Sequence, residues 1–126
     1  MEWSSEEVLA AFFRSLGNPV RMRILLLLQM EGELNVGQLV ERVGLTQGHV
    51  SNHLCCLRTC GAVATRQEKR SVYYRLASDE VRQILDVARL AVGDRAAQII
   101  GCPVLKRESI PDMDRREGSE PTNGSD

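Results

Sequence analysis

Apolar residues recur along most of this chain at intervals of three and four positions, the spacing that places them on one face of a helix. The first such segment has a wider apolar face than one helical contact requires. The second is apolar nearly all round, which places it at the centre of the core. The predicted helices cover residues 4–16, 20–30, 36–43, 45–60 and about 79–100. Gly93 allows a break in the last of them.

The order of the elements predicts a winged helix-turn-helix. Helices 36–43 and 45–60 are joined by a short turn that contains Gly44, which is the helix-turn-helix pattern. Residues 62–66 and 71–76 are short strand candidates, with a basic hairpin tip at 67–70. We therefore expect a mainly α (α+β) fold with about five helices and a two-stranded β-wing.

The length and composition indicate one small domain. The 126 residues predict a folded region over 1–105 and a disordered acidic tail over 106–126. No apolar run approaches the roughly 20 residues that a membrane span needs, and the N-terminus lacks the features of a secretion signal. Four cysteines without an export signal favour a reducing compartment, so we expect a cytoplasmic protein whose cysteines bind metal, react or are buried.

The net charge of −1 conceals an uneven distribution. Between positions 58 and 75 five basic residues face one acid, a local charge of +4, whereas from 107 to the end six acids face three arginines, a local charge of −3. A basic segment that follows a helix-turn-helix is typical of nucleic-acid binding.

Helix 45–60 is the predicted DNA-reading element. Thr46 can cap it, because a threonine hydroxyl accepts hydrogen bonds from the first backbone donors of a helix. The first turns of such a helix meet DNA bases. The candidates for these contacts are Gln47, Gly48, Ser51, Asn52 and His53, with His49 a weaker one.

The wing supplies a second set of candidate DNA contacts. Arg66, Lys69 and Arg70 are placed for phosphates or the minor groove. The alternative for the wing is a solvated charged hairpin. The alternatives for His53 are a polar residue at the margin of the DNA or dimer contact, and a metal ligand.

Two cysteines share one face at the end of the same helix. Cys56 and Cys60 are four positions apart, which brings their Cβ atoms to roughly 5–6 Å and lets two thiolates share one ion. Soft thiolates select thiophilic metals over hard cations. Cys55 points about 100° away from Cys56 and is the weaker candidate. On spacing alone, small buried thiols are an equally good interpretation.

Three stretches together resemble a known family. LVERVGLTQGHVSNHLCCLRTCGAV, NPVRMRILLLL and the basic wing resemble the ArsR/SmtB metal-sensing repressors, over roughly residues 12–91. The resemblance implies a homodimer paired through the first and last helices, which binds double-stranded operator DNA and releases it when metal binds. It implies no enzymatic activity and no membrane partner.

The family places its metal ligands in several different elements. The Cys-x-Cys site before the reading helix is missing here, because Asn35 and Gly37 occupy those positions. The Asp and His site of the last helix lacks its histidines. What remains resembles the cadmium- and lead-sensing members, which use two cysteines of the reading helix and one of the C-terminal tail. This implies Cys56, Cys60 and Cys102 as ligands, and Cd(II) or Pb(II) as effector, with Zn(II), Hg(II) and As(III) also suited to thiolates.

Other functions compete with metal sensing. A repressor of this fold could sense oxidants through a disulfide between Cys56 and Cys60, although helical positions i and i+4 are near the limit of disulfide geometry. A hydrolase using Cys56 and His53 lacks any evident oxyanion hole or substrate pocket. A DNA-binding module without a sensor is the third alternative. The physiological effector, the operator sequence and the protomer to which Cys102 contributes are left open.

Overall fold

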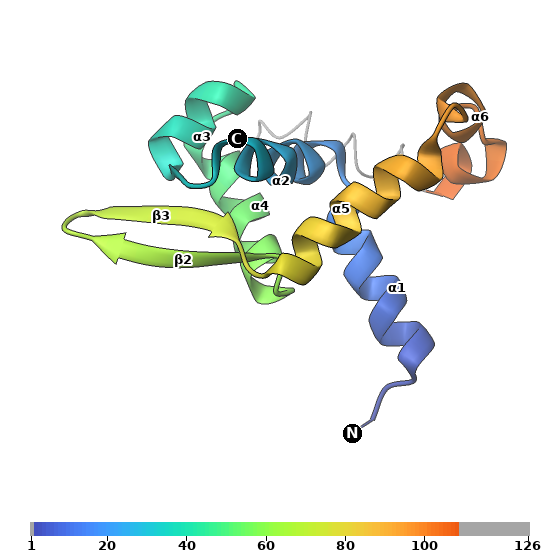
Figure 1. Ribbon diagram of the computed structural model, residues 1–126, viewed down its shortest axis with the longest axis horizontal. Helices are drawn as coiled ribbons and strands as arrows, with labels where there is room; N and C mark the ends of the chain where they lie inside the picture. The colour runs from blue at the N-terminus through green and yellow to red at the C-terminus, as the bar shows by residue number, and fades with distance from the viewer. Residues whose placement is uncertain (1, 109–126) are drawn as a thin grey trace. The chain divides into compact units, whose positions relative to one another are not determined.

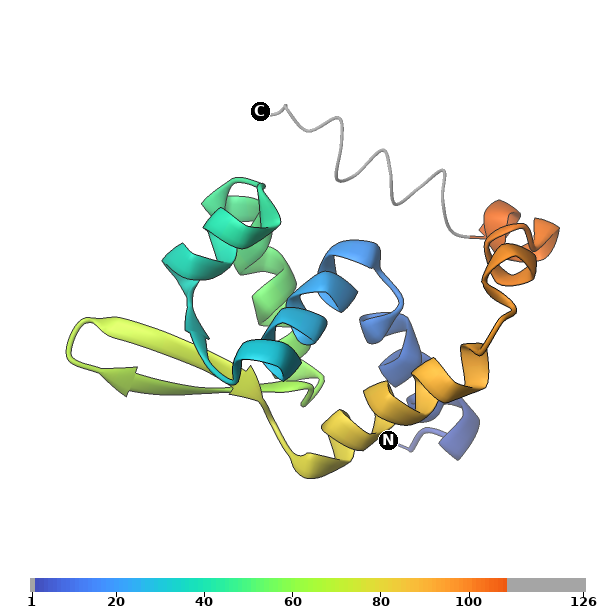
Figure 2. The same cartoon turned by 45° about the horizontal axis from the view of Figure 1, so that its top comes forward.

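The computed structural model of the chain describes residues 2–108, which form two compact units divided between Asp86 and Val87. The first unit holds most of the secondary structure (Figures 1 and 2). Its elements are α1 (Ser5–Leu16), α2 (Pro19–Glu31), β1 (Leu34–Asn35), α3 (Val36–Val43), α4 (Gln47–Thr59), β2 (Val63–Glu68), β3 (Ser71–Leu76) and the beginning of α5 (Asp79–Val92). The predicted winged helix-turn-helix is confirmed.

Side-chain caps set the starts of the helices. Ser4 and Glu7 form a reciprocal capping box at α1, and the side chain of Asn18 accepts hydrogen bonds from Val20 N and Arg21 N at the start of α2. Each such cap is worth about 1 kcal/mol because it satisfies backbone donors that the helix leaves unpaired. These local interactions explain why the helices begin within a few residues of their predicted positions.

The sheet has three strands, whereas the sequence predicted two. β1 pairs antiparallel with β3, so that Leu34 lies opposite Tyr74 and Asn35 opposite Tyr73, and the strand order is β1-β3-β2. A two-residue strand is too short to show alternation, and its pairing depends on a distant segment, so periodicity could not reveal it. β2 and β3 form a long hairpin that projects from the helices of the first unit (Figures 1 and 2).

The core of the first unit is centred on α2. Ile24, Leu25 and Leu28 are fully buried there, which confirms the predicted central position of this helix. Burial of each such side chain stabilises the fold by roughly 1.5–3 kcal/mol. The other residues of the cluster come from every neighbouring element: Leu16, Leu34, Leu39, Val50, Leu54, Leu57, Ala62, Val63, Leu76, Val81 and Leu85.

The second unit shows that the last predicted helix is divided. α5 ends at Val92, Gly93 adopts a left-handed backbone with φ of +52°, and α6 covers Ala96–Ile100. A single helix to residue 100 was therefore wrong, and the break lies at the glycine that permits it. Residues 106–108, predicted to begin the disordered tail, are helical, while positions 109–126 lie outside the described residues. The proposed boundary at 105/106 stays a prediction. Among residues 2–108 no helix has the length and apolar character of a membrane span.

Candidate DNA-reading surface and thiol pair

The start of α4 has the features expected of a helix that contacts DNA. Thr46 is its N-cap, and the hydroxyl accepts a hydrogen bond from His49 N at 3.3 Å, as predicted. The opposite face of the helix is anchored in the core by three fully buried or nearly fully buried residues, Val50, Leu54 and Leu57. The candidate contacts Gln47, Gly48, Ser51 and Asn52 are all exposed. Their side chains, and the open backbone at Gly48, are thus available to a partner along one side of an anchored helix.

His53 is buried, which contradicts its predicted place among the DNA contacts. It is only 7% exposed, and Arg21 Nη1 lies 3.3 Å from its Nδ1. A guanidinium has donors only, so Nδ1 accepts this hydrogen bond. The sequence contained a signal for this burial, because positions 50, 53, 54 and 57 follow the spacing of one helical face. We therefore remove His53 from the proposed contacts with DNA.

Arg21 connects three helices, a role that sequence reasoning missed. Its side chain is half-buried. Its Nε donates to Ser15 O at 2.6 Å and its Nη2 to Arg14 O at 3.2 Å, which satisfies carbonyls at the end of α1. Together with the contact to His53, these bonds link α1 and α2 to the reading helix. Nothing in the linear pattern distinguishes Arg21 from the neighbouring Arg23, whose Nη2 donates to Arg42 O at 2.9 Å.

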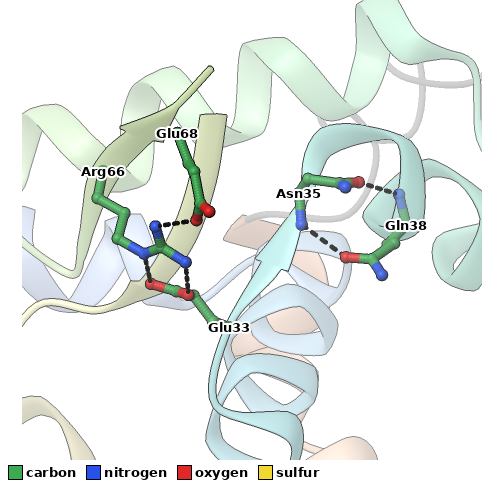
Figure 3. Close-up of polar contacts among 5 residues, drawn as sticks. All are labelled: Glu33, Asn35, Gln38, Arg66 and Glu68. Carbon is green, nitrogen blue, oxygen red and sulfur yellow. Dashed lines mark hydrogen bonds and ion pairs between the residues drawn. The ribbon is translucent and has the colours of Figure 1, made fainter. Parts of the chain in front are cut away.

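The wing has a structural arginine and two exposed cations at its tip. Arg66 donates to both carboxylate oxygens of Glu33, at 2.8 and 2.9 Å, and to Glu68 at 2.6 Å (Figure 3). Its guanidinium also lies over the ring of Tyr73, 4.9 Å from the centroid. The hydrogen bond from Arg66 lowers the pKa of Glu33, and the bonds to Glu33 and Glu68 raise the pKa of Arg66.

This arrangement separates the three basic residues of the predicted wing contact. Arg66 is fully engaged with carboxylates, so it holds the wing against the segment that precedes α3. Lys69 and Arg70 are exposed at the turn, and neither forms an ion pair with another residue of the described chain. Lys69 has a left-handed backbone, with φ of 58°, which closes the hairpin. Phosphate contact is better assigned to these two residues than to Arg66.

Cys56 and Cys60 lie side by side at the other end of α4. Cys56 is half-buried and Cys60 is exposed. Burial raises the pKa of Cys56, the neighbouring Cys60 thiol raises it further, and the positive charge of Arg21 opposes both effects. The interaction between the two thiols supports their predicted placement on one face. Because its pKa is raised, Cys56 is held as a thiol near neutral pH and must lose its proton to bind a metal.

The donor set fits a soft ion but is incomplete within the first unit. Two adjacent thiols suit a thiophilic metal, while the described residues contain no group of three or more His, Cys, Asp and Glu side chains that could hold one. Cys102, the predicted third ligand, belongs to the second unit, so its participation stays a prediction. Asn35, at the position of the missing Cys-x-Cys site, instead caps α3 through a 2.8 Å hydrogen bond from Gln38 N (Figure 3).

Known proteins share this architecture. Residues 18–65 match the family described as bacterial regulatory protein, arsR family. The HTH-type transcriptional regulator CmtR of Mycobacterium tuberculosis is 45% identical over 80 residues, which cover 64% of this chain and 67% of CmtR. A probable mercury resistance operon repressor of Streptomyces lividans is 33% identical over 99 residues, 79% of this chain and 78% of the relative.

A solved structure adds information on assembly. The homodimeric winged helix-turn-helix DNA-binding domain Mb0332 of Mycobacterium bovis, a possible ArsR-family regulator, superposes with a TM-score of 0.67 and 26% identity. The match covers 73% of this chain and 84% of that one. The geometry of the reading helix and wing and these four similarities point to the same class of protein.

Proposed function

This chain belongs to the arsR family of bacterial transcriptional regulators, and on that premise we propose that it is a homodimeric, metal-responsive repressor that binds double-stranded operator DNA. Its affinity for DNA falls when a thiophilic ion binds Cys56 and Cys60. One observation carries this proposal: the thiol pair and the exposed polar residues occupy the two ends of a single helix, α4.

Contact with DNA begins at the start of α4. Gln47, Ser51 and Asn52 meet base edges in the major groove, and Gly48 permits close approach of the backbone. Lys69 and Arg70 bind phosphate or the minor groove beside it. In a dimer, two such helices enter successive major grooves about 34–36 Å apart, so the operator is a near-palindrome.

Dimerisation uses the exposed apolar side chains of the first and last helices. On α1 these include Val8, Leu9 and Phe13, each more than half exposed. On α5 they include Val87 and Leu90. Such surfaces on a small protein are typical of an interface, and the related Mb0332 domain is homodimeric.

The thiols respond to metal through their protonation state. A Cd(II) or Pb(II) ion bound there would supply the charge that keeps both sulfurs deprotonated, and Cys102 of the tail would complete a trigonal thiolate set. Zn(II), Hg(II) and As(III) also suit thiolates. The affinity of the site for metal rises with pH, because the Cys56 thiol, whose pKa is raised, has to release a proton.

Arg21 is the charged group that connects the thiols to the rest of the fold. Its positive charge acts on Cys56 while its donors hold His53, Ser15 and Arg14. Thiolates formed at the pair attract this guanidinium, which weakens its bonds to the reading helix and to α1. Allosteric couplings are typically about 1–3 kcal/mol, whereas nearly complete switching needs roughly 5.5. The metal therefore has to act on both protomers or displace DNA contacts directly.

An operator-binding titration tests the proposal. The operator is first selected from random duplexes by the metal-free protein, and binding is then measured with Cd(II), Pb(II), Zn(II), As(III) and peroxide in turn. We expect Cd(II) or Pb(II) to release DNA from the wild-type chain and from Cys55→Ser, but not from Cys56→Ser or Cys60→Ser. Release by peroxide alone would instead identify a redox sensor. Indifference to every addition would identify a DNA-binding module without a sensor.

A further inference from the structure

The basic segment between positions 58 and 75 contains one cation that lies outside the wing. Of its five basic residues, Arg66 is bound to carboxylates, while Lys69 and Arg70 occupy the hairpin turn. Arg75 lies on β3 of the same hairpin. Arg58 instead belongs to the last turn of α4, the helix that carries the proposed base contacts.

The side chain of Arg58 is exposed, and it forms no hydrogen bond or ion pair with another residue of the described chain. Other arginines of the first unit donate to protein acceptors and hold its elements together: Arg21, Arg23, Arg42, Arg66 and Arg82. α4 contains no acidic residue, and Arg58 is its one arginine or lysine. Its guanidinium is therefore available to an anion from outside the protein.

Arg58 shares one side of α4 with two of the proposed base contacts. At about 100° per residue, Gln47, Ser51 and Arg58 fall within about 40° of one another around the helix axis. The exposed residue one turn after Ser51 is Cys55, whose small side chain does not shield the guanidinium. A partner that contacts Gln47 and Ser51 therefore meets Arg58 on the same surface.

The rise of the helix places Arg58 beyond the bases. An α-helix rises about 1.5 Å per residue, so Arg58 lies about 16 Å from Gln47 along the axis and about 10 Å from Ser51. The major groove of B-DNA is about 12 Å wide. A helix that contacts base edges with its first two turns therefore carries Arg58 to the edge of the groove, which phosphates border. A guanidinium binds a phosphate well, because its planar donors match two phosphate oxygens at once.

We propose that Arg58 is a positioning residue for operator binding, which holds the end of α4 to a backbone phosphate beside the major groove. It contributes affinity and fixes the depth at which the helix enters the groove, but it carries no base preference. With Lys69 and Arg70 at the hairpin turn, each protomer then has phosphate contacts at two separate places. This inference rests on the proposed DNA-reading surface and adds a residue to it.

A structural role for Arg58 makes a different prediction. A cation in the last turn of a helix stabilises that helix through its dipole, and Arg58 occupies this position in α4. Loss of a dipole interaction alone would lower the free energy of unfolding and leave the salt dependence of DNA binding unchanged. Loss of a phosphate contact lowers the salt dependence, because fewer counterions are released from the DNA on binding. The salt dependence therefore distinguishes the two roles.

The test measures binding of the full chain to the selected operator and to a scrambled duplex by fluorescence anisotropy. Each phosphate contact adds about 0.9 to the logarithmic salt slope, and a dimer holds two copies of Arg58. Between about 50 and 200 mM salt the wild type should therefore lose roughly tenfold more affinity than Arg58→Gln, on both duplexes. Arg58→Lys keeps the charge and should restore most of the slope. Arg95→Gln removes the same charge from an exposed position of the second unit and should match the wild type.

A second measurement needs no variant, so it holds even if Arg58→Gln fails to fold by circular dichroism. Phenylglyoxal modifies exposed guanidinium groups, and peptide mass mapping locates the modified arginines. Operator DNA should protect Arg58 from the reagent and leave Arg95 reactive.

Three results would overturn the inference. These are an unchanged salt slope in folded Arg58→Gln, a loss of affinity confined to the operator, and equal modification of Arg58 with and without DNA. The proposed repressor fails separately. If the wild type binds DNA but no metal releases it, the slope and the protection still decide the role of Arg58. If Cd(II) or Pb(II) releases the operator while the slope of Arg58→Gln is that of the wild type, only the role of Arg58 is wrong.

Discussion

At the start of α4, Gln47, Ser51 and Asn52 are exposed on a helix whose first turn is fixed by Thr46. Three turns later, Cys56 is half-buried and lies under the influence of Arg21 and Cys60. The first half therefore interacts with partners outside the protein, while the chemistry of the second half is controlled by its neighbours within it. Because both halves belong to one helix anchored in one core, a change at the thiols can affect the reading surface without a separate sensory domain.

The largest expected effect is the loss of Cd(II) affinity when a cysteine at the end of α4 is replaced. Cys56→Ser or Cys60→Ser should weaken Cd(II) binding by roughly 100-fold or more, because ligand loss exceeds the 10–100-fold cost of outer-shell changes. Thiolate-to-metal charge-transfer absorption measures this loss. Metal-free affinity for the operator should stay within about threefold of wild type, and Cys55→Ser serves as the matched control. A comparable loss of metal-free DNA binding would mean that the two ends are not functionally distinct.

A substitution in the first half of α4 should have the opposite pattern of effects, on DNA binding and not on metal binding. Asn52→Ala should reduce the preference for operator over unrelated DNA by about 1–3 kcal/mol, the worth of a good base contact. Its affinity for Cd(II) should not change. Fluorescence anisotropy with operator and scrambled duplexes measures the preference. Thr59→Ala, an exposed position at the far end of the same helix, is the control. Equal weakening on both duplexes would assign Asn52 to the DNA backbone instead.

A substitution at Arg21 tests whether this side chain connects the thiols to the DNA-reading half of α4. Arg21→Gln should lower the free energy of unfolding by about 1–3 kcal/mol, because half-buried acceptors lose their charged donor. It should also raise the pKa of Cys56 further, since the charge of Arg21 acts to lower it. Cd(II) binding would then begin at higher pH than in the wild type.

Urea unfolding and a pH series of Cd(II) titrations measure these two effects. Arg23→Gln is the matched control, because Arg23 lies on the same helix and donates to a carbonyl of α3. An unchanged pH profile in Arg21→Gln, with normal folding, would remove Arg21 from the proposed link between thiols and DNA.

The smallest expected effects are those of substitutions in the wing, at Arg66 near its base and at Lys69 at its tip. Lys69→Ala should weaken binding to all duplexes and reduce the salt dependence by about one counterion. Arg66→Ala should change the free energy of unfolding little, because its ion pairs are exposed and screened by solvent. Its effect on the salt dependence should be smaller than that of Lys69→Ala. Salt titrations of both variants measure the difference, and equal slopes would restore Arg66 as a phosphate contact.

Local patterns were enough to predict much of this molecule. The periodicity of α1 to α4, the cap at Thr46 and the glycine turn at Gly44 follow from interactions within a few residues, so the winged helix-turn-helix was predictable. The i, i+4 spacing of Cys56 and Cys60 likewise placed both thiols on one face. The resemblance of these stretches to a known family supplied the expectation of a regulator, which the comparisons confirm.

The roles of the charged and polar side chains were decided by the tertiary structure. The sequence marks Arg21, Arg66 and His53 as polar, but not that Arg21 binds His53 across two helices or that Arg66 pairs with Glu33. Strand β1 exists only because β3 lies beside it. An apolar cleft lined by residues of α1 and by Cys60 likewise requires α1 to pack near the end of α4. Helices and turns are stabilised by near neighbours in the chain, so the sequence predicts them. Contacts between residues far apart in the chain depend instead on how the elements pack, and only the tertiary structure shows that packing.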